Sequence, residues 1–314
     1  MILNGVDFGR LWNSSGARGF FGDPDEYWYH KYWHMLGLDY TGYTFVAKTT
    51  TLLQRTGNMP LDGRWRPREL RPKCIVVKPA KGVVLNAVGL SGPGLASLLS
   101  TDKWQNRREP FVISYMPDGE AGWELRANVK TFAHSLGQEL LRFRSPVALE
   151  INFSCPNVDH GSNHPDQVCQ LLDIMRDGGV TCPLIPKFNA LEPIQTAVEV
   201  AKCHNCDAVA VGNTIPWGRV PELIDWVKLF GTDISPLLSI GGGGLSGSPL
   251  LPLTVGWVSK ARHLIDKPII AGGGVLSARD ALTVMQAGAD ILEVGVVGML
   301  RPWNMRSIKD AVCK

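Results

Sequence analysis

The stretch AGGGVLSARDALTVMQAGADILEVGV, residues 271–296, carries the pattern that decides the fold. An apolar segment ends in three glycines, and an amphipathic stretch then leads into a second apolar segment. Ser277 is predicted to cap the helix, and Asp280, three residues later, resembles the acidic partner of a capping box. A strand, a glycine turn, a helix and a strand in this order predict two parallel strands joined by a crossover helix.

The same alternation extends over most of the 314 residues. From about residue 108 onward, six nearly continuous apolar segments are typical of strands buried on both faces: 111–116, 147–154, 183–189, 208–214, 268–273 and 291–297. Segment 44–50 and the weaker segment 9–16 complete a set of eight. We therefore predict an α/β fold, a (β/α)8 TIM barrel, with residues 1–314 forming a single domain.

Composition narrows the class of protein. With 45% hydrophobic and 19% charged residues, the chain can bury a sizeable core. No apolar run approaches the roughly 20 residues that a membrane-spanning helix needs, and the first residues lack the pattern of a signal peptide. A net charge of +3 is too small to indicate a nucleic-acid partner. We expect a cytoplasmic protein that acts on a small molecule and binds neither nucleic acid nor membranes.

The seven cysteines are odd in number and irregularly spaced, so reduced thiols are expected. Cys203 and Cys206 form a CxxC motif without a second pair, which favours structural cysteines over a zinc site. His160 and His164 lie four residues apart, but no glutamate accompanies them. Metal binding is not predicted at either place.

The aromatic segment DPDEYWYHKYWHML, residues 23–36, predicts a helix that opens near Pro24. Its aromatic side chains would suit a membrane-surface helix. Helical spacing instead favours an outer barrel helix that packs Trp28, Tyr32 and Met35 inward.

Two insertions, residues 52–82 and 215–247, follow predicted strands. Long connections at the carboxyl ends of barrel strands build active sites, so we expect inserted loops or strands that form the walls or lids of a pocket. The first insertion contains a basic cluster, for which a solvated loop is favoured over a subunit contact. This cluster comprises Arg64, Arg66, Arg68, Arg71 and Lys73.

Glycines late in the chain indicate a phosphate site. Gly272, Gly273 and Gly274 let the backbone approach a ligand near a helix start, and Gly295 follows the last strand in the same way. Gly243 and Gly244 could supply further amides. Each loop alone could be a tight turn, but three such loops together favour a phosphate, either of a substrate or of a cofactor.

The segment LEINFSCPN, residues 149–157, places Cys155 at the carboxyl end of a buried strand. A lone cysteine is usually a small core residue, but this one is flanked by Asn152 and Asn157. Similar strand ends carry Asn86, Asn213, Lys48 and Lys187. Because an amide offers both donors and an acceptor, several asparagines suit a flat cyclic amide or imide.

These segments together resemble the dihydroorotate dehydrogenase family, and specifically its soluble class 1, which uses a cysteine base. The resemblance covers nearly the whole chain and runs through NSSG (13–16), VAKTTTLLQRTGNMP (46–60), LNAVGL (85–90), LEINFSCPN (149–157), PKFN (186–189), VGNT (211–214), GGGGLSG (241–247), AGGGV (271–275) and EVGV (293–296). As an ordered set these motifs are highly specific.

The resemblance implies that FMN lies at the barrel mouth and that the substrate ring stacks against the flavin. The catalytic residues that the resemblance implies are Cys155, as the base, and Lys48, which would lie beside both ligands, with FMN as the hydride acceptor. The residues implied to bind dihydroorotate are Asn86, Gly89, Leu90, Asn152, Asn157, Asn213 and Thr214. Those implied to bind FMN are Ser15, Lys48, Thr49, Asn152, Lys187, Gly244, Gly273, Gly274, Gly295 and Val296.

Some positions depart from the family pattern, notably Val88, GLSG (89–92) and the loop VDHGSNH (158–164). The expected activity is oxidation of dihydroorotate to orotate in pyrimidine biosynthesis. The alternatives are a related FMN barrel that acts on another dihydropyrimidine and a flavin-free phosphate-binding barrel. The resemblance implies a homodimer. It leaves the electron acceptor open between fumarate, a quinone, and NAD reached through an iron–sulfur flavoprotein subunit.

Overall fold

The computed structural model describes residues 1–119, 122–153 and 164–313. Eight parallel strands form one sheet in the order β3-β14-β13-β10-β9-β8-β7-β4. A parallel bridge between Trp12 and Thr44 joins the two edge strands, where the N–H of Asn13 donates to the Thr44 carbonyl at 3.1 Å. The predicted (β/α)8 barrel is therefore confirmed, and each strand falls within its predicted segment. The strands are β3 (Leu11–Asn13), β4 (Phe45–Val46), β7 (Phe111–Tyr115), β8 (Val147–Asn152), β9 (Leu184–Phe188), β10 (Val209–Val211), β13 (Ile269–Gly272) and β14 (Ile291–Val294).

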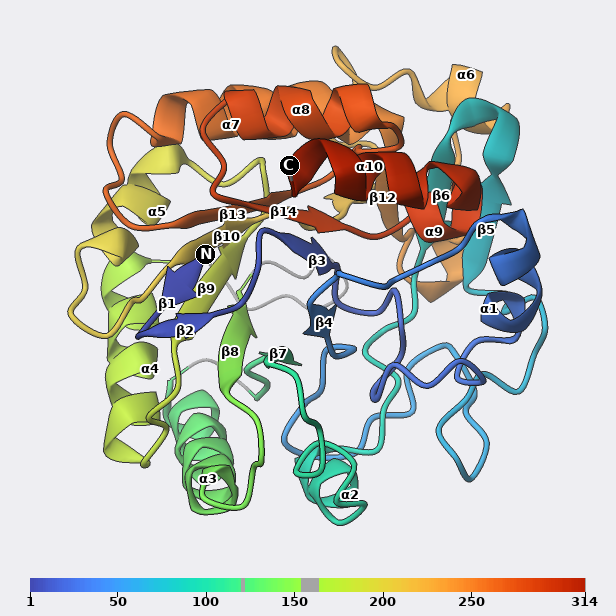
Figure 1. The fold of residues 1–314 in the computed structure, drawn as a ribbon. Coiled ribbons are helices and arrows are strands. Elements are labelled where there is room, and N and C mark those ends of the chain that lie inside the picture. Colours follow the sequence, from blue (N-terminus) through green and yellow to red (C-terminus); the bar gives the residue numbers. More distant parts are fainter. Residues whose placement is uncertain (120–121, 154–163, 314) are drawn as a thin grey trace.

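Helices surround the barrel, with α7, α8 and α10 along one side and α3 and α4 along another (Figure 1). The hydroxyl of Ser277 accepts from the Asp280 N–H at 3.2 Å, so the predicted N-cap of α8 is confirmed. The longer helices are α3 (Trp123–Leu140), α4 (Pro165–Asp177), α5 (Ile194–Ala201), α7 (Leu251–Ala261), α8 (Ala278–Gln286) and α10 (Met305–Val312). Shorter ones are α2 (Leu95–Leu99), α6 (Trp226–Phe230) and α9 (Val297–Leu300).

Apolar side chains fill the barrel interior at its amino-terminal end. Alternate strand residues such as Val46, Val112 and Ile270 point inward and are fully buried. A short hairpin of β1 (Ile2–Leu3) and β2 (Val6–Asp7) closes this end with Leu3. Polar side chains lie at the opposite end, where the strands finish.

The two predicted insertions meet in one antiparallel sheet of order β11-β12-β6-β5. Its strands are β5 (Ile75–Lys78), β6 (Val83–Asn86), β11 (Ile215–Pro216) and β12 (Gly244–Gly247). Leu245 lies opposite Leu85, and both are fully buried in an apolar cluster with Trp226. Because both insertions leave the carboxyl ends of barrel strands, this sheet forms a wall beside the barrel mouth.

The predicted orientation of the aromatic helix is wrong. Helix α1 (Trp28–Trp33) begins four residues after Pro24, and Trp28, Tyr32 and Met35 are exposed, Met35 to 80%. The helix has only six residues and continues into the 3₁₀ turn η1 (His34–Leu36). Trp28 and Tyr32 lie one turn apart on the same face of α1, so the predicted spacing holds, but this face is the exposed one and the opposite face, with His30, packs inward.

The prediction of reduced thiols is also wrong for one pair. Cys169 in α4 and Cys203 beyond α5 form a disulfide, with their Cα atoms 5.9 Å apart. Because the pairing follows from the packing of α4 against α5, the sequence spacing does not reveal it. Cys206, the other member of the CxxC motif, is a buried free cysteine whose thiol contacts the Ala208 carbonyl.

The basic cluster of the first insertion is a largely exposed loop, in which Arg66 pairs with Asp62 and Asp25. Over residues 1–119, 122–153 and 164–313, no helix combines the length and apolar character needed to cross a membrane.

Candidate active site

A buried lysine between two buried glutamates forms the centre of the barrel mouth. Lys187 on β9 donates to Glu293 Oε1 at 2.8 Å and to Glu150 Oε2 at 3.1 Å. Both glutamates have no exposed surface. Burial alone would lower the pKa of Lys187, but the charges of Glu150 and Glu293 outweigh burial and raise it. The lysine therefore stays charged inside the protein.

Hydroxyl groups close a circuit around this lysine. The Ser15 and Thr49 hydroxyls lie 2.7 Å apart, and Thr49 Oγ1 lies 3.0 Å from Ser114 Oγ. Ser114 donates to Glu150 Oε1 at 2.9 Å, and the backbone N–H of Ser15 donates to Glu293 Oε1 at 3.2 Å. The circuit links side chains at the ends of β3, β4, β7, β8, β9 and β14, so it holds the strand ends in one arrangement.

Sequence reasoning predicted Ser15, Thr49 and Lys187 but missed the other three members, Ser114, Glu150 and Glu293. A signal was present for the two glutamates, because each is a carboxylate within an otherwise apolar strand. Burial raises the pKa of Glu293 to about 7, against the opposing charge of Lys187. Glu293 can therefore hold a proton near neutral pH.

A chain of amides lies beside the lysine. Asn152 is opposite Lys187 in the strand register, and its Oδ1 accepts from Asn213 Nδ2 at 2.9 Å. Asn213 Oδ1 accepts from the Thr214 N–H at 2.9 Å, and the Thr214 carbonyl accepts from Asn189 Nδ2 at 2.6 Å. The structure thus brings together the predicted residues Asn152, Asn213 and Thr214. It adds Asn189, which the predicted site did not include.

The loop after β6 is tied to the barrel by Lys48. The Lys48 ammonium donates to the Ser91 carbonyl at 2.6 Å and lies 4.8 Å from the centroid of the Phe20 ring. Gly89 and Leu90, just before Ser91, both have left-handed backbone angles, with φ of 68° and 60°. This turn gives the loop its sharp reversal, in a left-handed conformation that leucine rarely adopts.

Asn86 and Gly244 lie opposite each other in the second sheet, where Asn86 Nδ2 approaches the Gly244 carbonyl at 3.5 Å. The predicted substrate loop and the predicted phosphate loop are therefore neighbours. This contact arises because the two insertions share one sheet.

The remaining glycine loops lie at adjacent strand ends, since β13 and β14 are paired. Gly273 and Gly274 have φ of 118° and 83°, and a Cβ at Gly274 would lie 2.2 Å from the backbone nitrogen of Leu251, at the start of α7. A Cβ at Gly295 would lie 3.2 Å from Ser14 Cβ, and Val296 caps α9. These close contacts explain why both loops need glycine.

Two predicted residues, Cys155 and Asn157, lie outside the described residues, as does most of the loop 158–164. Strand β8 ends at Asn152, three positions before Cys155 in the chain. Among the described residues, no group of three or more His, Cys, Asp or Glu side chains is placed to hold a metal ion.

A closed parallel barrel with a buried lysine, an amide chain and glycine loops at its strand ends defines a (β/α)8 barrel enzyme. Residues 18–313 match the family described as dihydroorotate dehydrogenase, and the chain belongs to this family.

Curated relatives agree with this assignment. The chain is 31% identical over 296 residues to a Streptococcus pneumoniae protein named dihydroorotate dehydrogenase B (NAD(+)), catalytic subunit, covering 91% of this chain and 83% of that protein. A Latilactobacillus sakei protein of the same name is 27% identical over 303 residues, covering 94% of this chain and 86% of the relative. An Eimeria tenella dihydroorotate dehydrogenase solved with ferulenol shares the fold, with a TM-score of 0.71 and 19% identity over 99% of this chain and 82% of that one.

Proposed function

We propose that this protein oxidises dihydroorotate to orotate, as an oxidoreductase acting on a CH–CH bond in pyrimidine biosynthesis. The observation that carries the proposal is the amide chain from Asn152 to Thr214 beside the buried cation of Lys187. The amides suit a pyrimidine ring, whose imide groups both donate and accept, and the neighbouring cation suits a flavin ring that gains negative charge. Membership of the dihydroorotate dehydrogenase family supports this substrate.

We infer that the flavin of this family is FMN in this chain. The glycine loops 273–274 and 295–296 fit a terminal phosphate, and the neighbouring hydroxyl circuit fits the polar edge of a ring. The residues that would hold FMN are Ser15, Lys48, Thr49, Asn152, Lys187, Gly244, Gly273, Gly274, Gly295 and Val296. When bound, FMN supplies a hydride acceptor.

Substrate would be held by Asn86, Gly89, Leu90, Asn152, Asn157, Asn213 and Thr214. Cys155 would remove one substrate proton at its Sγ atom while the adjacent carbon loses a hydride. A thiol with an ordinary pKa of about 8.5 serves as a base near neutral pH if its surroundings stabilise the thiolate or if the proton leaves as the hydride departs. Lys48 would position the loop at residues 89–91 against the substrate through its bond to Ser91.

Lys187 would stabilise negative charge that develops at the flavin ring. Its two carboxylate partners offset the positive charge of Lys187 and so weaken this stabilisation, unless Glu293 takes up a proton. The Glu150–Lys187–Glu293 group would thus adjust the local charge as reduction proceeds.

We further propose that residues 1–314 act as a single FMN-binding domain within a homodimer. The names of the S. pneumoniae and L. sakei relatives specify NAD(+) and a catalytic subunit, which supports a second, iron–sulfur flavoprotein subunit as electron acceptor over fumarate or a quinone.

The test is a visible spectrum of the purified protein, followed by anaerobic addition of dihydroorotate and, separately, dihydrouracil. We expect a flavin band that dihydroorotate bleaches and dihydrouracil, which lacks the carboxylate, bleaches far more slowly. Faster bleaching by dihydrouracil would favour another dihydropyrimidine as substrate. A colourless protein that binds no added FMN would favour a flavin-free barrel enzyme.

A further inference from the structure

The side chain of Asn189 holds the segment that carries two of the proposed substrate residues. Strand β10 ends at Val211, and residues 212–214 connect it to β11, which begins at Ile215. Asn189 directly follows β9 and is only 7% exposed. Its Nδ2 donates to the Thr214 carbonyl at 2.6 Å, so the end of β9 is tied to the start of the second insertion.

The direction of this hydrogen bond is fixed by the neighbouring backbone. Asn189 Oδ1 accepts from the Leu191 N–H at 2.9 Å, so the amide nitrogen is the group turned toward Thr214. The Asn189 carbonyl accepts from the Glu192 N–H at 2.9 Å, and the Glu192 carbonyl accepts from Trp257 Nε1 on α7 at 3.2 Å. A barrel helix therefore supports the turn that orients Asn189.

The bond from Asn189 acts on the next amides along the site. The Thr214 N–H donates to Asn213 Oδ1, and Asn213 Nδ2 donates to Asn152 Oδ1, each at 2.9 Å. The N–H and the carbonyl of Thr214 are thus both held, which fixes the backbone at this half-buried residue. Loss of the Asn189 donor would release the carbonyl and let the segment shift. Because hydrogen bonds weaken steeply with poor angles, a small shift would weaken the contacts that these amides make with a ligand.

We propose that Asn189 is a positioning residue for the substrate, which orients Thr214 and, through Thr214, the Asn213 amide. This role rests on the proposed function, in which Asn152, Asn213 and Thr214 hold the pyrimidine ring. Asn189 lies two positions after Lys187, whose register partner is Asn152. The end of β9 therefore supports both the flavin side and the substrate side of the site.

The alternative is that Asn189 only closes the turn after β9, for which its bond to the Leu191 N–H is sufficient. Asn189→Asp separates the two roles. The aspartate keeps an acceptor for the Leu191 N–H, but while ionised it has no donor for the Thr214 carbonyl. After it takes up a proton, its O–H can donate to this carbonyl again.

The test is titration of flavin-loaded wild type and Asn189→Asp with orotate, followed through the flavin absorption band at about pH 8 and about pH 5. At the higher pH the dissociation constant of the variant should exceed that of wild type by about tenfold or more, because a carboxylate replaces the donor to Thr214. At the lower pH this ratio should fall, because burial favours the protonated acid. Changes in orotate itself affect both proteins equally and cancel in the ratio.

Asn106→Asp is the matched control, since it adds the same charge at an exposed asparagine and should leave the affinity for orotate unchanged. Flavin content and the thermal midpoint are measured for each variant, because a purely structural role would lower these and leave the affinity unchanged. Equal affinity of wild type and Asn189→Asp at the higher pH, or a loss that does not recover at the lower pH, overturns the proposal.

Failure of the proposed function gives a different result, because wild type itself would then not bind orotate. Binding of uracil instead would correct the substrate, and the same comparison of wild type and Asn189→Asp would be made with uracil. Wild type that binds neither compound would refute the proposed function and, with it, the role of Asn189.

If Asn189→Asp does not fold or binds no flavin, Asn189→Ser takes its place. The serine hydroxyl can still accept from the Leu191 N–H, but its side chain is too short to replace the amide nitrogen at the Thr214 carbonyl. Weaker binding of orotate by Asn189→Ser, at unchanged flavin content, supports the proposal, and wild-type affinity overturns it.

Discussion

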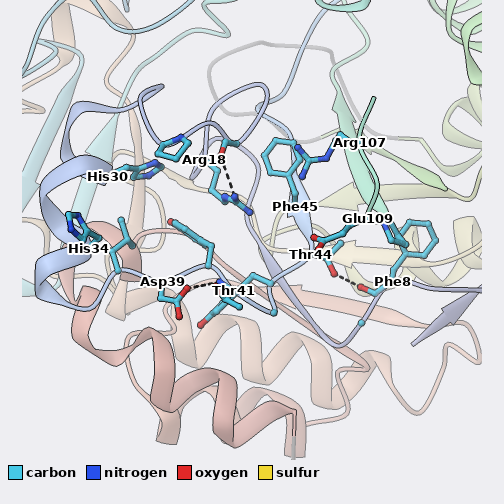
Figure 2. A pocket seen from close by; sticks show the side chains of 18 of the residues that line it. Phe8, Arg18, His30, His34, Asp39, Thr41, Thr44, Phe45, Arg107 and Glu109 are labelled. Carbon is cyan, nitrogen blue, oxygen red and sulfur yellow. Dashed lines mark hydrogen bonds between the residues drawn. The ribbon is translucent and has the colours of Figure 1, made fainter. Parts of the chain in front are cut away.

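The barrel mouth and the flank of the barrel around Arg18, Phe45 and Arg107 (Figure 2) both contain buried or half-buried cations, but these cations have different partners in the two regions. At the mouth, Lys187 has two carboxylate partners within 3.1 Å, and hydroxyls extend the contacts into a closed circuit. On the flank, Arg18 and Arg107 donate to backbone carbonyls and repel each other. The mouth therefore satisfies its cation with carboxylates in direct contact, whereas the flank satisfies its two cations with carbonyl oxygens and aromatic faces.

The largest effect is expected for Lys187→Met. This change leaves Glu150 and Glu293 buried and facing each other without a cation, so we expect a loss of about 3–5 kcal/mol in the free energy of unfolding. Urea denaturation of the flavin-free protein measures this loss. Lys202→Met is the control, because Lys202 pairs with Glu199 on the surface and should cost no more than about 1 kcal/mol. Equal losses in both variants would contradict the compensated arrangement.

A smaller, pH-dependent effect is expected for Glu293→Gln. The folded state raises the pKa of Glu293 from 4.5 to about 7, so between these values the folded protein holds a proton that the unfolded chain has lost. Wild-type stability should therefore fall as pH rises through this window, by at most about 1.4 kcal/mol per pH unit, and level off above it.

Glu293→Gln should remove this dependence. The urea midpoints of both proteins are compared between pH 5 and 8. Other titrating groups, such as His30, contribute equally to both proteins, so their contributions cancel in the difference. Parallel pH profiles for wild type and Glu293→Gln would show that Glu293 is ionised in the fold throughout this range.

The smallest effect is expected for Arg107→Met. The variant retains an unbranched apolar stem against Phe45 and relieves repulsion with Arg18, but the Phe21 carbonyl loses its donor, so the free energy of unfolding should fall by about 0.5–1.5 kcal/mol. Thermal unfolding of wild type and Arg107→Met measures this loss. A loss as large as that of Lys187→Met would contradict the difference between the two regions.

Much of the barrel could be predicted from sequence, because most of the barrel strands are nearly continuous apolar segments, as strands buried on both faces require. The orientation of α1 could not, because the spacing of Trp28 and Tyr32 defines one face of the helix but does not say whether that face packs inward or points to solvent. The disulfide between Cys169 and Cys203 depends on how α4 packs against α5, and spacing along the chain does not encode this contact.

The site was predicted in part. Ser15, Thr49 and Lys187 are in mutual contact through the circuit, but the partners that complete it, Glu150 and Glu293, were read only as strand residues. The arginine pair on the flank had no sequence signature, because Arg18 and Arg107 are 89 positions apart and are brought together only by their contacts with Phe45. The roles of Cys155 and Asn157 remain predictions.

The account is tested most directly by the rate at which dihydroorotate reduces the bound flavin in Cys155→Ala and in wild type, measured anaerobically at neutral pH. The variant should keep its flavin band and be reduced about 10²–10⁴-fold more slowly, because it lacks the base that takes the substrate proton. Reduction of Cys155→Ala at the wild-type rate would contradict the proposed chemistry at the barrel mouth.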